Sequence, residues 1–307
     1  MALRRCPQCG ATVEAEDHVL ATACAFCESP LVDAAEDAEP VDRVVSFRLD
    51  RPKAAARLQD HIQSRWFVHP DLKRATRPQE LRPVLVPHYA WDAVARTEYR
   101  CDVGIYWYRT ESYTTWRNGK RVRRTRRVRE TEWFPFSGHH GRTWYDHLTC
   151  ASRGIPAAEA AALEPWDLGR ALPWAPSLAA GVEAEHPTVD HPTALATARQ
   201  SLADLEARVI GAEHLPGDTH RRLKSETAVE IDDVDLVLLP IWIAVYQAKG
   251  PVRLLVNGQT GEVAGKVPRS APPLKVILAA LGVLLLLGLA IFFLISCVGC
   301  VGALVEG

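Results

Sequence analysis

Motifs that mark several common enzyme classes are missing from this sequence. There is no G-x-S-x-G nucleophile elbow and no H-E-x-x-H zinc-protease motif. Segment 261–267, GEVAGKV, is similar to a phosphate-binding loop, but its glycines are one residue too close together. Val267 also stands where Ser or Thr would hold magnesium. We therefore expect a protein that is not an enzyme, and specifically not a helicase or another nucleoside triphosphatase.

A large net charge and a disulfide framework are missing as well. The chain has 36 basic and 37 acidic residues, so no overall field attracts it to a polyanion. No apolar stretch follows the first six residues, which argues against a secretory signal. Four of the eight cysteines form two close pairs within the first 27 residues. Paired cysteines without a signal peptide indicate metal binding in a reducing compartment.

The two cysteine pairs predict a zinc ribbon over residues 1–32. Cys6 and Cys9 are separated by fourteen residues from Cys24 and Cys27. Two C-x-x-C turns that face each other supply four thiolates for a tetrahedral, structural Zn²⁺. Residues 12–14 and 19–22 are expected to be the two strands of one hairpin. So short a segment cannot bury enough core to fold alone, and the metal supplies the missing free energy.

The charges of the predicted ribbon favour a protein partner over nucleic acid. Two basic residues, Arg4 and Arg5, are outnumbered by four acidic residues, Glu14, Glu16, Asp17 and Glu28. A surface that binds phosphates needs an excess of positive charge. We therefore expect the ribbon to be a protein-recognition module.

Charged residues are also absent from 276–305 near the C-terminus. The densest apolar part, 276–298, is predicted to be one transmembrane helix, because 23 helical residues reach about 35 Å. Lys266, Arg269 and Lys275 precede it and only Glu306 follows it, which places the N-terminal part in the cytoplasm. We expect a proline-rich joint at 269–275, a short tail at 299–307, and tail-anchored insertion into the cytoplasmic membrane.

The middle of the chain predicts an α+β domain. After an acidic linker at 33–42, a mixed domain over 43–268 is expected, with a strand at 41–47 and helices at 51–66 and 193–210. Ala55, Leu58, Ile62 and Trp66 share one face of the first helix. Residues 183–192 are interpreted as a loop, and 252–264 as a hairpin. Segments 84–90 and 238–244 contain the same pattern: two aliphatic residues, Pro, any residue and an aromatic residue. This indicates either a structural repeat or two edge strands with a proline kink.

A basic hairpin is the most unusual feature of this domain. Residues 105–116 and 121–133 predict two strands joined by the turn Arg117-Asn118-Gly119-Lys120. From Arg117 to Arg129 there is no acidic residue and there are eight basic ones: Arg117, Lys120, Arg121, Arg123, Arg124, Arg126, Arg127 and Arg129. Beside aromatic residues they suit single-stranded nucleic acid, and next to a bilayer they suit anionic lipid. A solvated hairpin balanced by nearby glutamates is the third alternative.

A cluster of histidines is the best remaining candidate for chemistry. His139 and His140 are followed by Asp146 and His147. Adjacent residues of a strand point to opposite faces, so the first two are not expected to share a metal. We interpret the cluster as structural and keep an enzyme that uses it as an alternative.

Several segments resemble a family of bacterial proteins of uncharacterised function. They are WFVHPDL at 66–72, VPHYAWDA at 86–93, LEPWDL at 163–168, LPIW at 239–242 and VNGQTGEV at 256–263, with Gly265 and Pro268 after the last. This family has an N-terminal zinc ribbon and a C-terminal membrane helix, and its members are often named after the primosomal replication-restart helicase. The resemblance implies the same arrangement here and implies no catalytic residues.

These observations predict a membrane-tethered, zinc-binding protein that serves as a binding or scaffold module. Membrane lipid and a protein are the expected partners. The alternative is a membrane-associated nucleic-acid-binding protein that uses the ribbon and the basic hairpin.

Overall fold

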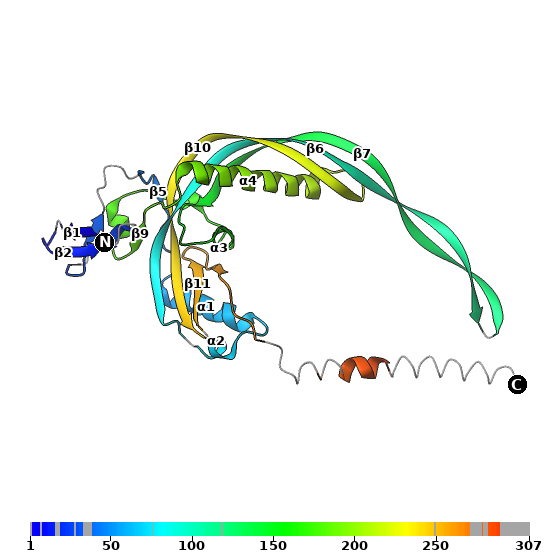
Figure 1. Cartoon of the computed structure of the whole chain (residues 1–307), viewed down its shortest axis with the longest axis horizontal. Helices are drawn as coiled ribbons and strands as arrows, with labels where there is room; N and C mark the ends of the chain where they lie inside the picture. Colours follow the sequence, from blue (N-terminus) through cyan, green and yellow to red (C-terminus); the bar gives the residue numbers. More distant parts are fainter. Residues whose placement is uncertain are drawn as a thin grey trace.

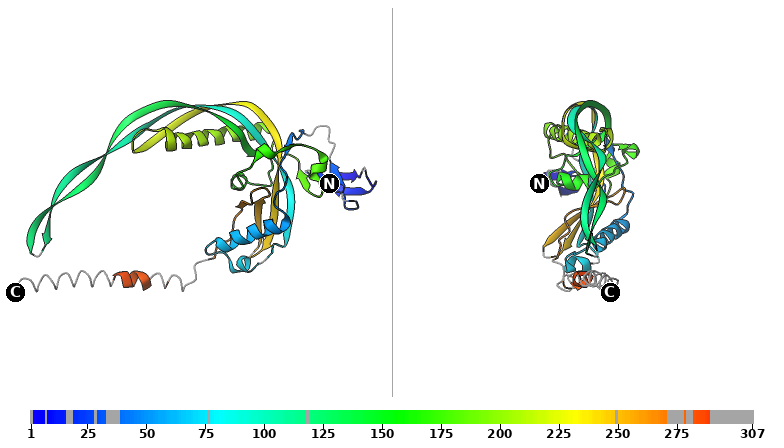
Figure 2. Two further views of the ribbon diagram at one scale, coloured as in Figure 1. Left: turned by 180° about the vertical axis from the view of Figure 1, so that it is seen from behind. Right: turned by 90° about the vertical axis from the view of Figure 1, so that its right-hand side faces the viewer.

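The computed structural model describes residues 2–6, 8–15, 19–27, 29–32, 39–75, 77–117, 119–248, 250–270, 278 and 282–288. A body made of sheet and helices carries a long, arching band of strands (Figure 1). Seen end-on, the arch is narrow (Figure 2). The predicted mixture of helices and antiparallel hairpins is therefore present, but one hairpin extends far beyond the body.

Three long antiparallel strands form the band. They are β6 (Glu80–Arg117), β7 (Lys120–Cys150) and β10 (Thr219–Gln247). β6 lies between the other two, with β10 paired to its first part and β7 paired from His88 to its end. The predicted turn after Arg117 is confirmed, because Arg117 pairs with Lys120. The strands on either side are much longer than the sequence predicted.

Among the described residues, shorter strands extend this band into a ten-stranded sheet. β11 (Pro251–Asn257) and β12 (Val263–Ala264) continue beyond β10 and confirm the predicted hairpin at 252–264. β9 (Glu183–Glu185) pairs in parallel with β6. β5 (Arg43–Val44) pairs in parallel with β10, and β8 (Leu172–Pro173) pairs with β5. The strand predicted at 41–47 is therefore confirmed only at its centre.

The two helices that cover the sheet begin with the same local sequence, Asp-x-Pro. α1 (Arg51–Ser64) is capped by Asp50, whose side chain accepts a hydrogen bond from the Lys53 N–H. α4 (His191–Val209) is capped in the same way by Asp190. Proline at the start of a helix loses no hydrogen bond, which explains why both segments are helical. The prediction that 183–192 is entirely loop is wrong, since β9 and the start of α4 lie within it.

The other helical segments within residues 39–270 are short. They are α2 (Pro70–Arg74), α3 (Ala157–Ala161), the 3₁₀ turns η1 (Leu168–Arg170) and η2 (Pro176–Ala179), and the π-helical turn η3 (Ile210–His214) that extends α4. α1 packs Leu58 and Ile62 against Trp242 and Leu254 of the sheet. α4 lies along the inner side of the arch and packs Ala194 and Ala198 against Tyr89 and Trp91 (Figures 1 and 2).

The two similar proline-containing segments lie side by side in the middle of the sheet. Pro87 of β6 pairs with Leu238, and Pro240 of β10 pairs with Leu85. Pro87 falls between the positions where β6 leaves β9 and joins β7. Pro240 falls in the matching gap between β5 and β11. The missing N–H groups therefore interrupt no ladder, and the edge-strand alternative is wrong.

The band bends where both outer strands carry a β-bulge at the level of Asp92. β7 places two residues, 145 and 146, opposite the single residue Asp92, and β10 has Asp232 as an extra residue between the partners of Asp92 and Ala93. Bulges bend a strand and increase its twist. Asp146 has a φ of 51°, and its N–H donates to the Asp92 carboxylate over 2.8 Å. We call this level the elbow, since it turns the sheet from the body into the arch.

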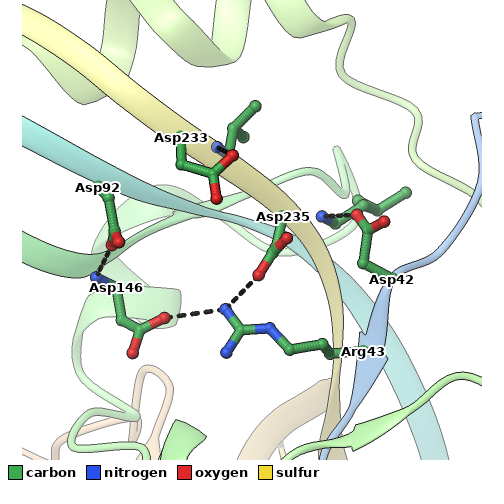
Figure 3. A network of polar contacts seen from close by, with 8 residues as sticks. Asp42, Arg43, Asp92, Asp146, Asp233 and Asp235 are labelled. Carbon is green, nitrogen blue, oxygen red and sulfur yellow. Dashed lines mark hydrogen bonds and ion pairs between the residues drawn. The ribbon is translucent and has the colours of Figure 1, made fainter.

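One arginine clamps the elbow (Figure 3). The guanidinium of Arg43 in β5 lies 2.9 Å from the Asp146 carboxylate and 2.7 Å from that of Asp235. Burial lowers the pKa of Arg43, but the hydrogen bond to Asp146 and the charge of Asp235 outweigh this effect. The pKa of Arg43 is therefore raised above its ordinary value, and the side chain keeps its charge. Arg43 therefore ties the strand that follows the ribbon to both β7 and β10.

Several predicted segments fall outside the described residues. They are most of the acidic linker at 33–42, most of the proline-rich joint at 269–275, and the tail at 299–307. Of the predicted transmembrane helix at 276–298, only residues 278 and 282–288 are described. Within the described part of the chain, no helix is both long enough and apolar enough to cross a membrane.

Replacing Arg43 with Met tests the clamp. Two carboxylates would lose their partner at a site where only 29% of the arginine side chain is exposed. We expect the free energy of unfolding to fall by about 1–2 kcal/mol, between the values typical of surface and buried pairs. Urea denaturation of the purified protein, followed by tryptophan fluorescence, measures this change.

The matched control is Arg96→Met. Arg96 also forms a 2.9 Å ion pair, with Glu230, but its side chain is 67% exposed. A loss below about 0.5 kcal/mol is expected there. If both variants lose the same free energy of unfolding, the ion pairs of Arg43 are ordinary surface pairs and Arg43 does not clamp the elbow.

Candidate metal centre and hairpin arm

Each cysteine pair lies in the turn of its own hairpin. Cys6 and Cys9 lie between β1 (Ala2–Arg5) and β2 (Thr12–Ala15), which pair with each other. Cys24 and Cys27 lie between β3 (Val19–Ala23) and β4 (Pro30–Val32). The predicted hairpin of 12–14 with 19–22 is therefore wrong. Its strands belong to different hairpins because each C-x-x-C segment itself forms the reversal.

Backbone hydrogen bonds shape both turns around the sulfur atoms. In the first turn, the Gly10 N–H donates to the Cys6 carbonyl over 2.9 Å, and the Cys6 N–H donates to the Ala11 carbonyl. Gly10 has a φ of 76°, which glycine adopts at little cost. In the second turn, the Cys24 N–H donates to the Ser29 carbonyl over 2.9 Å.

The four cysteines lie close enough to hold a metal ion. Their sulfur atoms all lie within 4.8 Å of one another. Sγ of Cys6 is 3.6 Å from Sγ of Cys27, and Sγ of Cys9 is 3.7 Å from Sγ of Cys24. In a tetrahedral zinc site with Zn–S bonds of about 2.3 Å, sulfurs stand about 3.8 Å apart. The cluster thus agrees with the predicted ligands and fits one zinc ion.

Ser29, which the sequence analysis did not single out, contacts two of these sulfurs. Its Oγ lies 3.2 Å from Sγ of Cys6 and 3.0 Å from Sγ of Cys27. The Ser29 hydroxyl is the main cause that lowers the pKa of Cys6 to about 6 and also lowers that of Cys27. For Cys9, the Ala11 N–H lowers the pKa, but contacts with neighbouring thiols and burial raise it to about 12. Ser29 therefore favours the thiolate form that binds metal.

The second hairpin of the ribbon is continuous with the main sheet, whereas β1 and β2 form a separate two-stranded sheet. β3 pairs with β9, which pairs in turn with β6. Leu20 and Ala21 pack with Val44 and Leu85 of the body. On the outer side of the ribbon, Phe26 between the two cysteines of the second turn is 73% exposed. A metal bound here would hold one edge of the sheet in place and present an aromatic side chain to solvent.

At the far end of the sheet, β6 and β7 extend beyond β10 as a two-stranded hairpin. β10 ends where Thr219 pairs with Gly104, and β6 continues from Ile105 to Arg117 with only β7 beside it. We call residues 105–132 the hairpin arm. At about 3.3 Å per residue, its thirteen pairs extend about 40 Å.

The strand register sorts the arm into two unlike faces, because directly paired residues point to the same side. One face, the balanced face, carries acidic as well as basic residues. There, Arg109 lies 2.9 Å from Glu130, and Arg126 lies 2.8 Å from Glu111. The glutamates of the solvated-hairpin alternative are Glu111, Glu130 and Glu132, and all three lie on this face and balance its charge only.

The opposite face carries arginine, aromatic and hydroxyl side chains and no acidic residue. Its pairs are Tyr106–Thr131, Tyr108–Arg129, Thr110–Arg127, Ser112–Thr125, Thr114–Arg123 and Trp116–Arg121. The guanidinium of Arg129 lies 4.3 Å from the Tyr106 ring centre, and that of Arg127 lies 4.8 Å from the Tyr108 ring centre. We call this surface the acid-free face.

The eight basic residues predicted as one anionic-surface site are therefore divided. Arg121, Arg123, Arg127 and Arg129 lie on the acid-free face. Arg117, Lys120, Arg124 and Arg126 lie on the balanced face. The sequence carries this division in its alternation, but it can be assigned only once the turn fixes the register.

The predicted histidine cluster holds α4 against the arch. His140 Nδ1 lies 2.7 Å from the carboxylate of Glu206, which is fully buried in α4, and Trp144 Nε1 donates to the same carboxylate. His147 Nε2 lies 2.6 Å from Ser201 Oγ, and burial lowers the pKa of His147. His139, the next residue of the same strand, is exposed. Sequence reasoning missed Glu206, because nothing in the sequence distinguishes this buried glutamate from the exposed glutamates of a helix.

No protein-family model, curated protein or solved structure matches the chain.

Replacing Ser29 with Ala tests its role at the metal site. The purified protein is expected to contain one zinc per chain, and removal of a group that positions a ligand typically weakens binding about 10–100-fold. A competition titration with a colorimetric chelator measures the affinity. Ser29→Thr keeps the hydroxyl and should bind zinc like the wild type. Equal affinities for all three proteins would exclude a role for this hydroxyl.

Proposed function

We propose that the protein is a membrane-tethered zinc-binding protein that acts as a non-enzymatic binding or scaffold module. The observation that carries this proposal is the four-sulfur cluster, with tetrahedral spacing, in a ribbon that joins the main sheet. Four protein ligands leave no open coordination position for a substrate. Zinc would then serve to keep the ribbon folded and fixed on the body.

A protein is the proposed partner of the ribbon. Its sequence has more acidic than basic residues, which does not suit phosphate. Exposed Phe26 in the second cysteine turn supplies an aromatic anchor of the kind that dominates protein interfaces.

The proposed tether is segment 276–298, and its support comes from sequence. The segment has no charged residue, and Lys266, Arg269 and Lys275 precede it. On this basis, the ribbon, the body and the arm would stand on the cytoplasmic side of the inner membrane.

A membrane fractionation experiment tests the tether and the scaffold together. The full chain is expected to stay in the membrane fraction after alkaline carbonate extraction, and deletion of 276–298 should release it. Cys24→Ser should leave the chain in the membrane fraction, but crosslinks from residue 26 to other proteins should no longer form. Release of the full chain by carbonate would refute the tether, and identical crosslinks in both proteins would refute recognition through the ribbon.

The acid-free face favours a second candidate, binding of nucleic acid by the arm. Four arginines and a row of hydroxyl groups match the side chains that most often contact phosphates. The two strands cross over each other along the arm, so this face winds around its axis (Figure 1). A flat bilayer cannot contact such a face along its length, whereas a nucleic acid strand can follow it.

Charge reversal on one face of the arm tests this candidate. Arg121→Glu with Arg123→Glu is expected to weaken binding of single-stranded DNA more than tenfold at low salt. It should also reduce the salt-dependence slope by about 1–2, as expected when about two phosphate contacts are lost. Fluorescence anisotropy across a salt series measures both.

The matched control reverses Arg124 and Arg126, which are close neighbours on the balanced face. The change in net charge is identical, so a face-specific site predicts a clearly smaller loss. If the wild type does not bind at low salt, or if both variants lose affinity equally, the acid-free face is not a nucleic-acid site.

A further inference from the structure

Two large aromatic side chains are exposed where the chain leaves the body toward segment 276–298. The sequence predicted Trp66 on the buried face of a helix, but α1 ends at Ser64 and Trp66 is 83% exposed. Phe67 beside it is 39% exposed, and the two ring centres lie 6.5 Å apart. The helix thus ends before its apolar pattern does and leaves both rings in solvent.

The backbone around these residues is held in an unusual conformation. Phe67 has a φ of 58°, a left-handed conformation that is uncommon for a bulky residue. Its carbonyl accepts hydrogen bonds from the Ser270 N–H over 2.7 Å and from the Ser270 hydroxyl over 3.2 Å. The backbones of Val68 and Arg269 form an isolated antiparallel β-bridge. The segment that leads to residue 276 is therefore fastened to the same loop that exposes the two rings.

A groove with positive charge accompanies the rings. It has a volume of about 430 Å³ and is lined by Ser64, Arg65, Trp66, Phe67, Val68, Val267 and Arg269. Its lining contains two arginines and no acidic residue. We call this surface the foot. Aromatic rings beside arginine are the composition found where a protein meets lipid headgroups.

Chain length limits how far the foot can lie from segment 276–298. Six residue steps separate Ser270 from Val276, so the chain between them spans at most about 20 Å. If 276–298 crosses the bilayer, the foot must stay within this distance of the hydrocarbon edge.

We propose that the foot is a lipid-binding surface, on which Trp66 and Phe67 enter the headgroup region and Arg65 and Arg269 bind lipid phosphates. This inference rests on the proposed membrane tether. It adds that the body stands on the bilayer through a defined surface, which would fix the direction of the ribbon and of the arm relative to the membrane.

Hydroxyl-radical labelling with mass spectrometry tests the foot in the full chain. The protein is reconstituted in vesicles of phosphatidylcholine and phosphatidylglycerol, and the variant without 276–298 serves as the lipid-free reference. Labelling of Trp66 is expected to fall several-fold in vesicles. Tyr145 at the elbow is 74% exposed and serves as the internal control, with no change expected.

The outcomes separate the foot from the tether. If the full chain fails to float with the vesicles, the tether is refuted and the foot with it. If the chain floats and Trp66 is labelled as strongly as in the reference, only the foot is overturned. Protection that disappears when the protein is diluted in excess lipid indicates contact between two copies of the chain and also overturns the foot.

A charge variant tests the phosphate contacts. Protection of Trp66 should be stronger in vesicles that contain phosphatidylglycerol than in pure phosphatidylcholine. Arg65→Gln with Arg269→Gln should remove this difference, while the Arg96→Gln control on the exposed surface of β6 keeps it. A difference that persists in the double variant would overturn the assignment of the two arginines.

Discussion

Backbone pairing along β6 connects the parts of the molecule. β10 pairs with β6 from Glu80 to Gly104, β9 joins the ribbon to β6 at Val84 and Leu85, β7 pairs from His88 onward, and the last third of β6 forms the arm. A shift of one residue in this pairing would exchange the faces of every strand. It would expose the core side chains Tyr89 and Trp91 and mix the two faces of the arm. The bulges at the level of Asp92 and the clamp of Arg43 fix the register at the elbow.

The cysteine cluster is connected to the same strand pairing. The ribbon contributes β3 and β4 to the edge of the sheet, and Leu20 and Ala21 to its core. A ribbon this short needs metal to fold. Loss of a metal ion held by these cysteines would therefore disturb the β3–β9 pairing as well as the cysteine turns. Strand pairing fixes the ribbon on the body. This attachment would hold Phe26 in a constant direction relative to the body.

Sequence reasoning succeeded where chemistry is local. The C-x-x-C turns, the reversal between Arg117 and Lys120, and the hairpin after β11 all follow from residues within a few positions of one another. Sequence reasoning failed where contacts with residues distant in the sequence determine the local structure. Trp66 fits the apolar period of α1, but the pairing of Val68 with Arg269 ends the helix and turns this side chain outward. The strands of the ribbon were assigned to one hairpin because spacing does not reveal which strands pair.

The sequence by itself determined which four cysteines can hold a metal ion, the mixture of helices and antiparallel hairpins, and the concentration of positive charge between Arg117 and Arg129. These depend on residue type and on short spacing. Only the tertiary structure decided that the ribbon joins the sheet, that Arg43 clamps the elbow, and that Glu206 is buried beneath the arch. It also divided the eight basic residues between two faces. Those outcomes depend on strand register and on contacts between residues far apart in the chain, which local propensity does not specify.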